Sequence, residues 1–175
     1  VTSASWNYEK TKPAVDYLVN TIMVAINIEW QWKTNLDKIY ANNEVESYKE
    51  FCLKILNNAD ISISDFKMDS KRIIDASNGS DFSTELIRVM AKEDSDSATR
   101  LENSNVYDFV TFHDIKNGEA SERYSLNLDE ESLGTVQMFK YTPLLYYVFK
   151  KGRVLFVDEL DKSLHPLMVE YLVKL

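Results

Sequence analysis

The sequence has 175 residues, 45% of them hydrophobic and 12% aromatic, which is long enough and apolar enough for one folded domain with a core. Twenty basic residues against 28 acidic ones give a net charge of -8 at pH 7, which repels phosphate backbones and argues against direct binding of nucleic acid. One cysteine and two histidines argue against a disulfide framework and a structural zinc site. Without a signal peptide or a membrane-length apolar run, the sequence predicts a cytoplasmic protein.

The first part of the chain predicts two helices and a short strand. Pro13 suits the first turn of a helix with one buried face. Asn43 followed by Glu46 resembles a capping box, which predicts a second helix ending near residues 57 and 58. Isoleucine alternates with serine over residues 61–64, as in a short half-buried strand. The apolar positions are Val15, Leu18, Val19, Ile22, Met23 and Ile26 in the first helix, and Val45, Tyr48, Cys52, Ile55 and Leu56 in the second.

The middle of the chain predicts a polar insertion and then a β-hairpin. Residues 68–105 are rich in Ser, Asp, Asn, Lys and Glu, and only residues 83–92 show helical periodicity, which indicates a flexible insertion or lid. Two strand-like segments follow, Val106–Ile115 and Ser121–Leu128. Asn117-Gly118 between them is a strong hairpin turn signal. Histidine 113 lies within the first of these strands without a carboxylate or cysteine at ligand spacing, so no metal site is expected there.

The last part of the chain predicts a helix, a strand and a second helix. Residues Thr135–Phe149 have helical periodicity, although Pro143 must kink this helix or leave one carbonyl unpaired, and Gly152 ends it. Val154–Val157 is a continuous apolar run, typical of a parallel strand buried on both faces of an α/β sheet. Pro166 opens the last helix.

The segment RVLFVDELDKSLHP, residues 153–166, has the strongest chemical signal. Its strand delivers Asp158 and Glu159 to its C-terminal end, which is the edge where open α/β sheets bind ligands. In magnesium-nucleotide chemistry, the first carboxylate holds hydrated Mg²⁺ and the second orients or deprotonates the attacking water. The alternative is a strand that ends in two solvated acids.

A second motif, ESLGT at Glu131–Thr135, lies one helix upstream. Its order and spacing relative to the carboxylates resemble the signature motif and Walker B of ABC-class ATPases. In that family the signature serine and glycine sit at a helix N-terminus and face the γ-phosphate of ATP held by the partner subunit. The resemblance therefore implies ATP contacts for Ser132 and Gly134. Thr135 is grouped with them, although it replaces the family's glutamine, and Leu133 replaces its first glycine.

These motifs resemble one branch of the family more closely than the rest. ESxGT, a helix with a central proline, a strand and DExxxSLHP resemble the abortive-infection and restriction-linked ATP-binding proteins, which are anti-phage ATPases of prokaryotes related to the overcoming-lysogenization-defect and SMC groups. Residues 1–29 are similar to the stretch that those proteins carry between their P-loop half and their signature half. The resemblance implies an α/β fold, part of an ABC-type P-loop NTPase head with a buried parallel strand, flanking helices, a β-hairpin and a helical insertion.

The resemblance also implies roles for single residues and a division of the chain into segments. It implies that Asp158 positions Mg²⁺, that Glu159 is the general base, and that His165 belongs to the D-loop, although His165 could simply cap a helix. Residues 1–67 would be a helix and strand segment of the head, 68–105 the insertion, and 106–175 the hairpin, signature helix, Walker B strand and D-loop.

No GxxxxGK[ST] motif exists among the four glycines, and no Q-loop is recognisable. The switch histidine would fall beyond Leu175. We therefore expect the C-terminal part of a head whose P-loop half lies upstream in the same protein. The implied activity is ATP hydrolysis coupled to ATP-gated homodimerisation in phage defence. An effector protein is a further partner that the resemblance implies. The alternative is a non-catalytic scaffold or dimerisation module with a degenerate nucleotide site.

Overall fold

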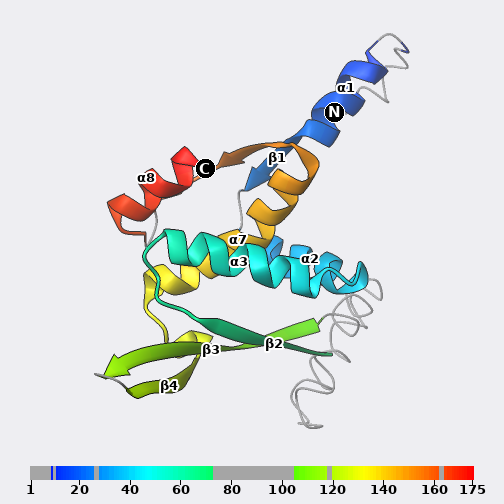
Figure 1. Cartoon of the computed structure of the whole chain (residues 1–175). Coiled ribbons are helices and arrows are strands. Elements are labelled where there is room, and N and C mark those ends of the chain that lie inside the picture. The colour runs from blue at the N-terminus through cyan, green and yellow to red at the C-terminus, as the bar shows by residue number, and fades with distance from the viewer. Residues whose placement is uncertain (1–8, 10, 26–27, 73–104, 118–119, 162–163) are drawn as a thin grey trace, which may run out of the picture. The chain divides into compact units, whose positions relative to one another are not determined.

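The structure is a computed structural model that describes residues 9, 11–25, 28–72, 105–117, 120–161 and 164–175 (Figure 1). It divides into two compact units. Unit 1 consists of residues 1–61 and 132–175, and unit 2 consists of residues 62–131. Unit 2 is therefore an insertion within the sequence of unit 1. In the described residues no helix is long and apolar enough to cross a membrane.

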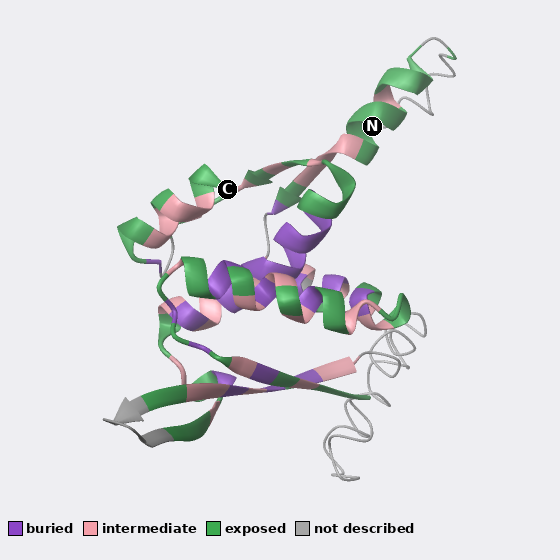
Figure 2. Cartoon of the chain, in the orientation of Figure 1, coloured by how far each residue is buried: buried purple, intermediate pink, exposed green. Residues whose placement is uncertain are grey.

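The core of unit 1 forms around α7, Leu133–Lys151. Helices α2, Ile28–Ala41, and α3, Val45–Asn58, pack against it. Every residue from Tyr141 to Val148 is buried, so α7 is enclosed on more than one side (Figure 2). Full burial of one large apolar side chain contributes about 1.5–3 kcal/mol. Fully buried side chains of this core include Leu36, Ile39, Leu56, Met138, Phe139 and Leu144.

A buried hydroxyl resolves the problem that Pro143 poses inside α7. Proline has no N–H, so the carbonyl of Phe139 lacks its usual helical partner. The hydroxyl of Thr142 donates to that carbonyl instead, at 2.8 Å. Because this uses the only proton of Thr142, the Tyr48 hydroxyl at 2.9 Å and the Cys52 thiol at 3.3 Å both donate to Thr142 Oγ1. Burial raises the pKa of Cys52 to about 12 and that of Tyr48 well above 10, which keeps both groups protonated as donors.

The first predicted helix is wrong in its second half and in its buried face. Helix α1, Lys12–Thr21, ends where strand β1, Ile22–Ala25, begins, and none of its residues is buried. Strand β1 pairs in parallel with β5, Val154–Val157, with Ile22 opposite Val154. The run Ile-Met-Val-Ala suits a parallel strand as well as a helix, and the distant partner strand decides between them. Ile26 lies outside the described residues.

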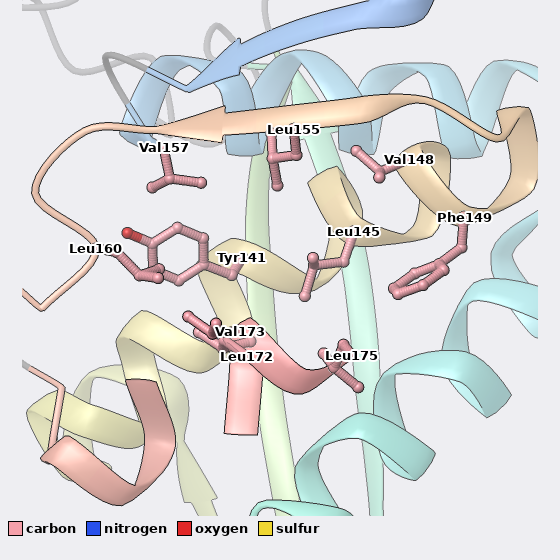
Figure 3. Close-up of a pocket in the computed structure, with 10 residues that line it drawn as sticks. All are labelled: Tyr141, Leu145, Val148, Phe149, Leu155, Val157, Leu160, Leu172, Val173 and Leu175. Atoms are coloured by element: carbon pink, nitrogen blue, oxygen red, sulfur yellow. The ribbon is translucent and has the colours of Figure 1, made fainter. Parts of the chain in front are cut away.

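The prediction that β5 is buried on both faces is also wrong. The exposed fractions of Val154 and Phe156 are 51% and 55%, and that of Val24 in β1 is 47%. The sheet of β1 and β5 has two strands, and its other face lines a pocket of about 430 Å³ shared with α7 and α8, Pro166–Lys174 (Figure 3). Only this second face is covered by helices of the described chain. The pocket is lined by Tyr141, Leu145, Val148, Phe149, Leu155, Val157, Leu160, Leu172, Val173 and Leu175.

The other predicted helices of unit 1 are confirmed. Helix α7 begins two residues before the predicted Thr135, and Gly152 ends it in the left-handed conformation with φ 58°. Helix α3 ends at Asn58 as predicted, but its predicted capping box is wrong. Its N-cap is Glu44, which makes no side-chain cap hydrogen bond, and Asn43 adopts φ 56°. The sequence analysis missed α2.

The described residues of unit 2 form an antiparallel sheet in the order β2-β3-β4, followed by a 3-10 turn, η2, at Leu128–Glu130. The predicted hairpin is confirmed, since β3, Asn105–Asn117, pairs with β4, Ala120–Asn127. Strand β2, Asp65–Arg72, extends into the segment predicted as a polar insertion. Residues 61–64 precede β2 and are not part of a strand, although their isoleucines are buried and their serines exposed as expected. The predicted turn glycine 118 and the helix over 83–92 lie outside the described residues.

Candidate functional site

The two adjacent carboxylates lie at the C-terminal edge of the parallel sheet. The backbone N–H of Asp158 donates to the carbonyl of Ala25 at 3.2 Å, so the pairing of β5 with β1 continues one residue beyond the strand. Both Asp158 and Glu159 are exposed. The structure therefore presents two acidic side chains to solvent at the edge where ligands of such sheets bind.

Glu159 has a strained backbone, with φ 52°. The other described non-glycine residues with positive φ are Asn43 and Asp60, which belong to types that tolerate this conformation. For a residue such as glutamate, a left-handed backbone costs of order 1–3 kcal/mol, and such residues cluster at functional sites.

A glutamine that the sequence analysis did not single out also lies at this end of the sheet. The side-chain amide of Gln31, in α2, donates to the carbonyl of Val24 in β1. Its Oε1 atom is buried and has no hydrogen-bond partner among the described residues. No sequence signal distinguishes Gln31 from other helical glutamines, because its position depends on how α2 follows β1.

Across the described ranges, no group of three or more His, Cys, Asp and Glu side chains is arranged to hold a metal ion. A metal cage built only from protein ligands is thus not found there. Mg²⁺ needs no such cage, since it is commonly held by one or two carboxylates together with water and substrate phosphates. Asp158 and Glu159 fit a metal of that kind.

The ESLGT motif surrounds the start of α7. Ser132 is the N-cap, and its Oγ accepts a hydrogen bond from the backbone N–H of Thr135 at 3.1 Å and lies 2.8 Å from Thr135 Oγ1. The amides of Leu133 and Gly134 have no intrahelical partner, as is usual for the first turn of a helix. A 19-residue helix also has a positive dipole end here. The arrangement suits an anion, and Ser132 is exposed where one would approach.

His165 caps the last helix. Its Nδ1 accepts a hydrogen bond from the backbone N–H of Leu167 at 3.3 Å, and the side chain is exposed. This is the capping role that the sequence analysis left open beside the D-loop role. The predicted D-loop comprises residues 163–166, and residue 163 lies outside the described residues.

The structure brings some of these residues together and keeps others apart. Asp158 and Glu159 share one turn, and Ser132, Gly134 and Thr135 share the first turn of α7. The beginning of α7 and the end of β5 are well separated in Figure 1, and both belong to unit 1. The described residues thus form two partial sites, one acidic and one that suits an anion.

One comparison with known proteins identifies a family of nucleotide-binding domains. Residues 6–175 match the model of a family described as "AAA domain, putative AbiEii toxin, Type IV TA system". Searches of curated proteins and of solved structures found no match. Since the family model covers nearly the whole chain, the chain belongs to this AAA domain family of P-loop ATPases.

Proposed function

We propose that this chain is the signature and Walker B portion of an ABC-type ATPase head, which hydrolyses ATP in a cycle of ATP-gated dimerisation. The observation that carries the proposal is the strained Glu159 directly after Asp158, at the carboxyl end of a parallel strand. A strand that ended in two solvated acids would need no left-handed glutamate.

Each side chain has a role in this proposal. Asp158 would hold the Mg²⁺ that accompanies ATP, and that ion would supply positive charge beside the phosphates. Glu159 accepts a proton from the attacking water. Ser132 and the amide of Gly134 contact the γ-phosphate of ATP held by a second copy of the chain, and Thr135 holds Ser132 in place. The separation of α7's start from the carboxylates favours this arrangement between two subunits.

The phosphate cradle must come from outside these 175 residues, because none of their glycines belongs to a P-loop motif. We propose that a P-loop segment of the same protein supplies it. The D-loop role of His165, action in phage defence and an effector partner are further parts of this proposal, and the family description, which names a toxin system, supports a defence role.

A scaffold without catalysis is the second candidate function. The missing P-loop motif favours it, because a head that cannot hold phosphates would keep the Walker B strand only as architecture.

An experiment with mixed dimers of the complete protein separates the two. Ser132→Arg and Glu159→Gln chains, carrying different affinity tags, are each nearly inactive alone if both residues act on ATP. In a mixed dimer, one composite site contains both substitutions. The other site combines an unchanged Ser132 from one chain with an unchanged Glu159 from the other. Equal mixing makes half of the dimers mixed, so turnover recovers to about a quarter of wild type if the two sites act independently.

The matched control is Glu170→Gln, which makes the same chemical change at an exposed position of α8 and should leave turnover unchanged. Co-purification of the two tags verifies that subunits have exchanged. If the tags co-purify and no activity returns in a protein whose two sites fire independently, Ser132 does not act on the partner's ATP. A wild-type protein that forms dimers but hydrolyses no ATP supports the scaffold.

A further inference from the structure

His113 joins the two chain segments that connect unit 2 to unit 1. The chain enters unit 2 at Ser62 and leaves it at Glu131. In β3, Nδ1 of His113 lies 2.8 Å from the carbonyl oxygen of Ser62, and Nε2 lies 2.7 Å from Oε1 of Glu131. One side chain therefore binds both the first and the last residue of the inserted unit.

Each ring nitrogen of His113 lies beside an oxygen atom that can accept a hydrogen bond. A carbonyl oxygen can only accept, so Nδ1 carries a proton and donates to Ser62. The Glu131 carboxylate also accepts at Oε1, where the hydroxyl of Thr111 is a second hydrogen-bond partner. Hydrogen bonds to a carboxylate are among the stronger ones in proteins, and the ring is held at both of its nitrogens.

The surroundings hold the ring in place. The imidazole stacks on Tyr124 of β4, with ring centroids 4.8 Å apart and planes 11° apart. The exposed fractions are 12% for the His113 side chain and 8% for that of Glu131, so solvent screens the pair weakly. The incoming chain is fixed once more where the backbone N–H of Ser64 donates to the carbonyl of Phe112 at 2.8 Å.

We propose that His113 is a positioning residue for the signature motif. Glu131 is one peptide bond from Ser132, so the clasp formed by Ser62, His113 and Glu131 fixes the point from which the chain enters α7. The inference rests on the proposed function in that Ser132 acts on nucleotide. Without His113 the first turn of α7 loses this anchor, and the signature serine is no longer held ready for the phosphate.

Hydrogen exchange on the complete protein tests the clasp without relying on catalysis. In His113→Phe the ring can still stack on Tyr124, but both hydrogen bonds are lost. The reporters are the amides of Thr135 and Val136, which bind Ser132 Oγ and the Ser132 carbonyl. Their exchange should become about tenfold faster or more. Unchanged exchange at both amides overturns the proposal.

A kinetic measurement then separates positioning from plain stability. In His113→Phe, kcat should fall about tenfold while the KM for ATP stays within about twofold, because the P-loop is untouched. Glu131→Gln keeps an acceptor for Nε2 and should retain most of kcat. The matched control is Arg123→Gln, which breaks the exposed Arg123–Asp114 ion pair of the same hairpin and should change neither exchange nor kcat.

The two proposals can fail separately. Faster exchange with an unchanged kcat refutes positioning, since the clasp would then order the start of α7 without any effect on catalysis. A wild-type protein without ATPase activity refutes the proposed function, and the exchange experiment still decides whether the clasp anchors α7. If His113→Phe does not fold, Glu131→Leu breaks one end of the clasp alone, and unchanged exchange in that variant overturns the proposal.

Discussion

Thr142→Val should destabilise unit 1 far more than the size of the change suggests. The two side chains have nearly the same shape, and Thr142 is 0% exposed. Valine removes the hydroxyl that donates to the Phe139 carbonyl, which lacks the usual helical donor because residue 143 is proline. It also removes the oxygen that accepts from Tyr48. Each stranded buried polar group costs about 1–3 kcal/mol, so we expect a loss of about 2–6 kcal/mol.

The assay is urea unfolding followed by circular dichroism. A loss of this size is a large part of the roughly 5–15 kcal/mol that stabilises a typical domain. The urea concentration at the unfolding midpoint should therefore fall clearly, while the dependence of the free energy of unfolding on urea concentration stays constant. Thr142→Ser is the control, because it keeps the hydroxyl and loses one methyl group at a cost of about 0.8 kcal/mol.

A double-mutant cycle sharpens the test. Tyr48→Phe removes the hydroxyl that donates to Thr142 Oγ1, so in that background Thr142→Val should cost at least about 1 kcal/mol less than it does in the wild type. Equal stability of the valine and serine variants would refute the reasoning, because the hydroxyl would then contribute nothing.

Three further predictions concern the site and the core. In the complete protein Glu159→Gln should keep ATP binding, slow hydrolysis at least ~10²-fold and trap an ATP-bound dimer. Turnover assays and gel filtration measure these effects, and unchanged turnover would show that Glu159 is not the general base. Glu159→Gly should remove the same activity yet raise stability by of order 1 kcal/mol, because glycine adopts φ 52° without strain, and an unfolding midpoint below wild type contradicts this. The 175-residue chain alone should bind MgATP no better than about millimolar, since the phosphate-cradling amides of a P-loop are missing from it, and micromolar binding by calorimetry would disprove this.

The pKa of Cys52 predicts how stability depends on pH. Its folded pKa of about 12 exceeds the ordinary value of 9.0, so its contribution is complete below pH 9 and is lost as pH rises towards 12. Between pH 9 and 11 the free energy of unfolding should fall by up to about 1.4 kcal/mol per pH unit from this group. Cys52→Ala should show a smaller fall, measured by urea midpoints at each pH, and an equal fall in both proteins would rule out the thiol as the cause.

The parts of the fold that depend on neighbouring residues could be predicted from the sequence. Asn117 and the alternating strands around it predict the hairpin, and Gly152 predicts the end of α7. The two carboxylates could be placed because their position after β5 follows directly from the order of residues. In each case the decisive interactions lie within a few residues of the signal.

The parts that depend on distant residues could not be predicted. The segment Ile22–Ala25 forms a strand because β5 pairs with it, and no local pattern identifies that partner. His113 seemed to have no carboxylate partner, yet Glu131 meets it because the chain folds back through β4 and η2. The strain at Glu159 depends on the turn after β5, which the sequence does not indicate.

The parallel pairing of β1 with β5 also has a consequence for biosynthesis. Ile22 lies opposite Val154, so β1 leaves the ribosome 132 residues before its partner. At about 5–20 residues per second, this strand waits roughly 7–26 s. Unit 2 is complete in the meantime, and it brings the ends of its 62–131 segment into contact with the same histidine. Because it roughly halves the loop that β1 and β5 must close, its early folding lowers the entropic cost of their pairing by about 0.6 kcal/mol.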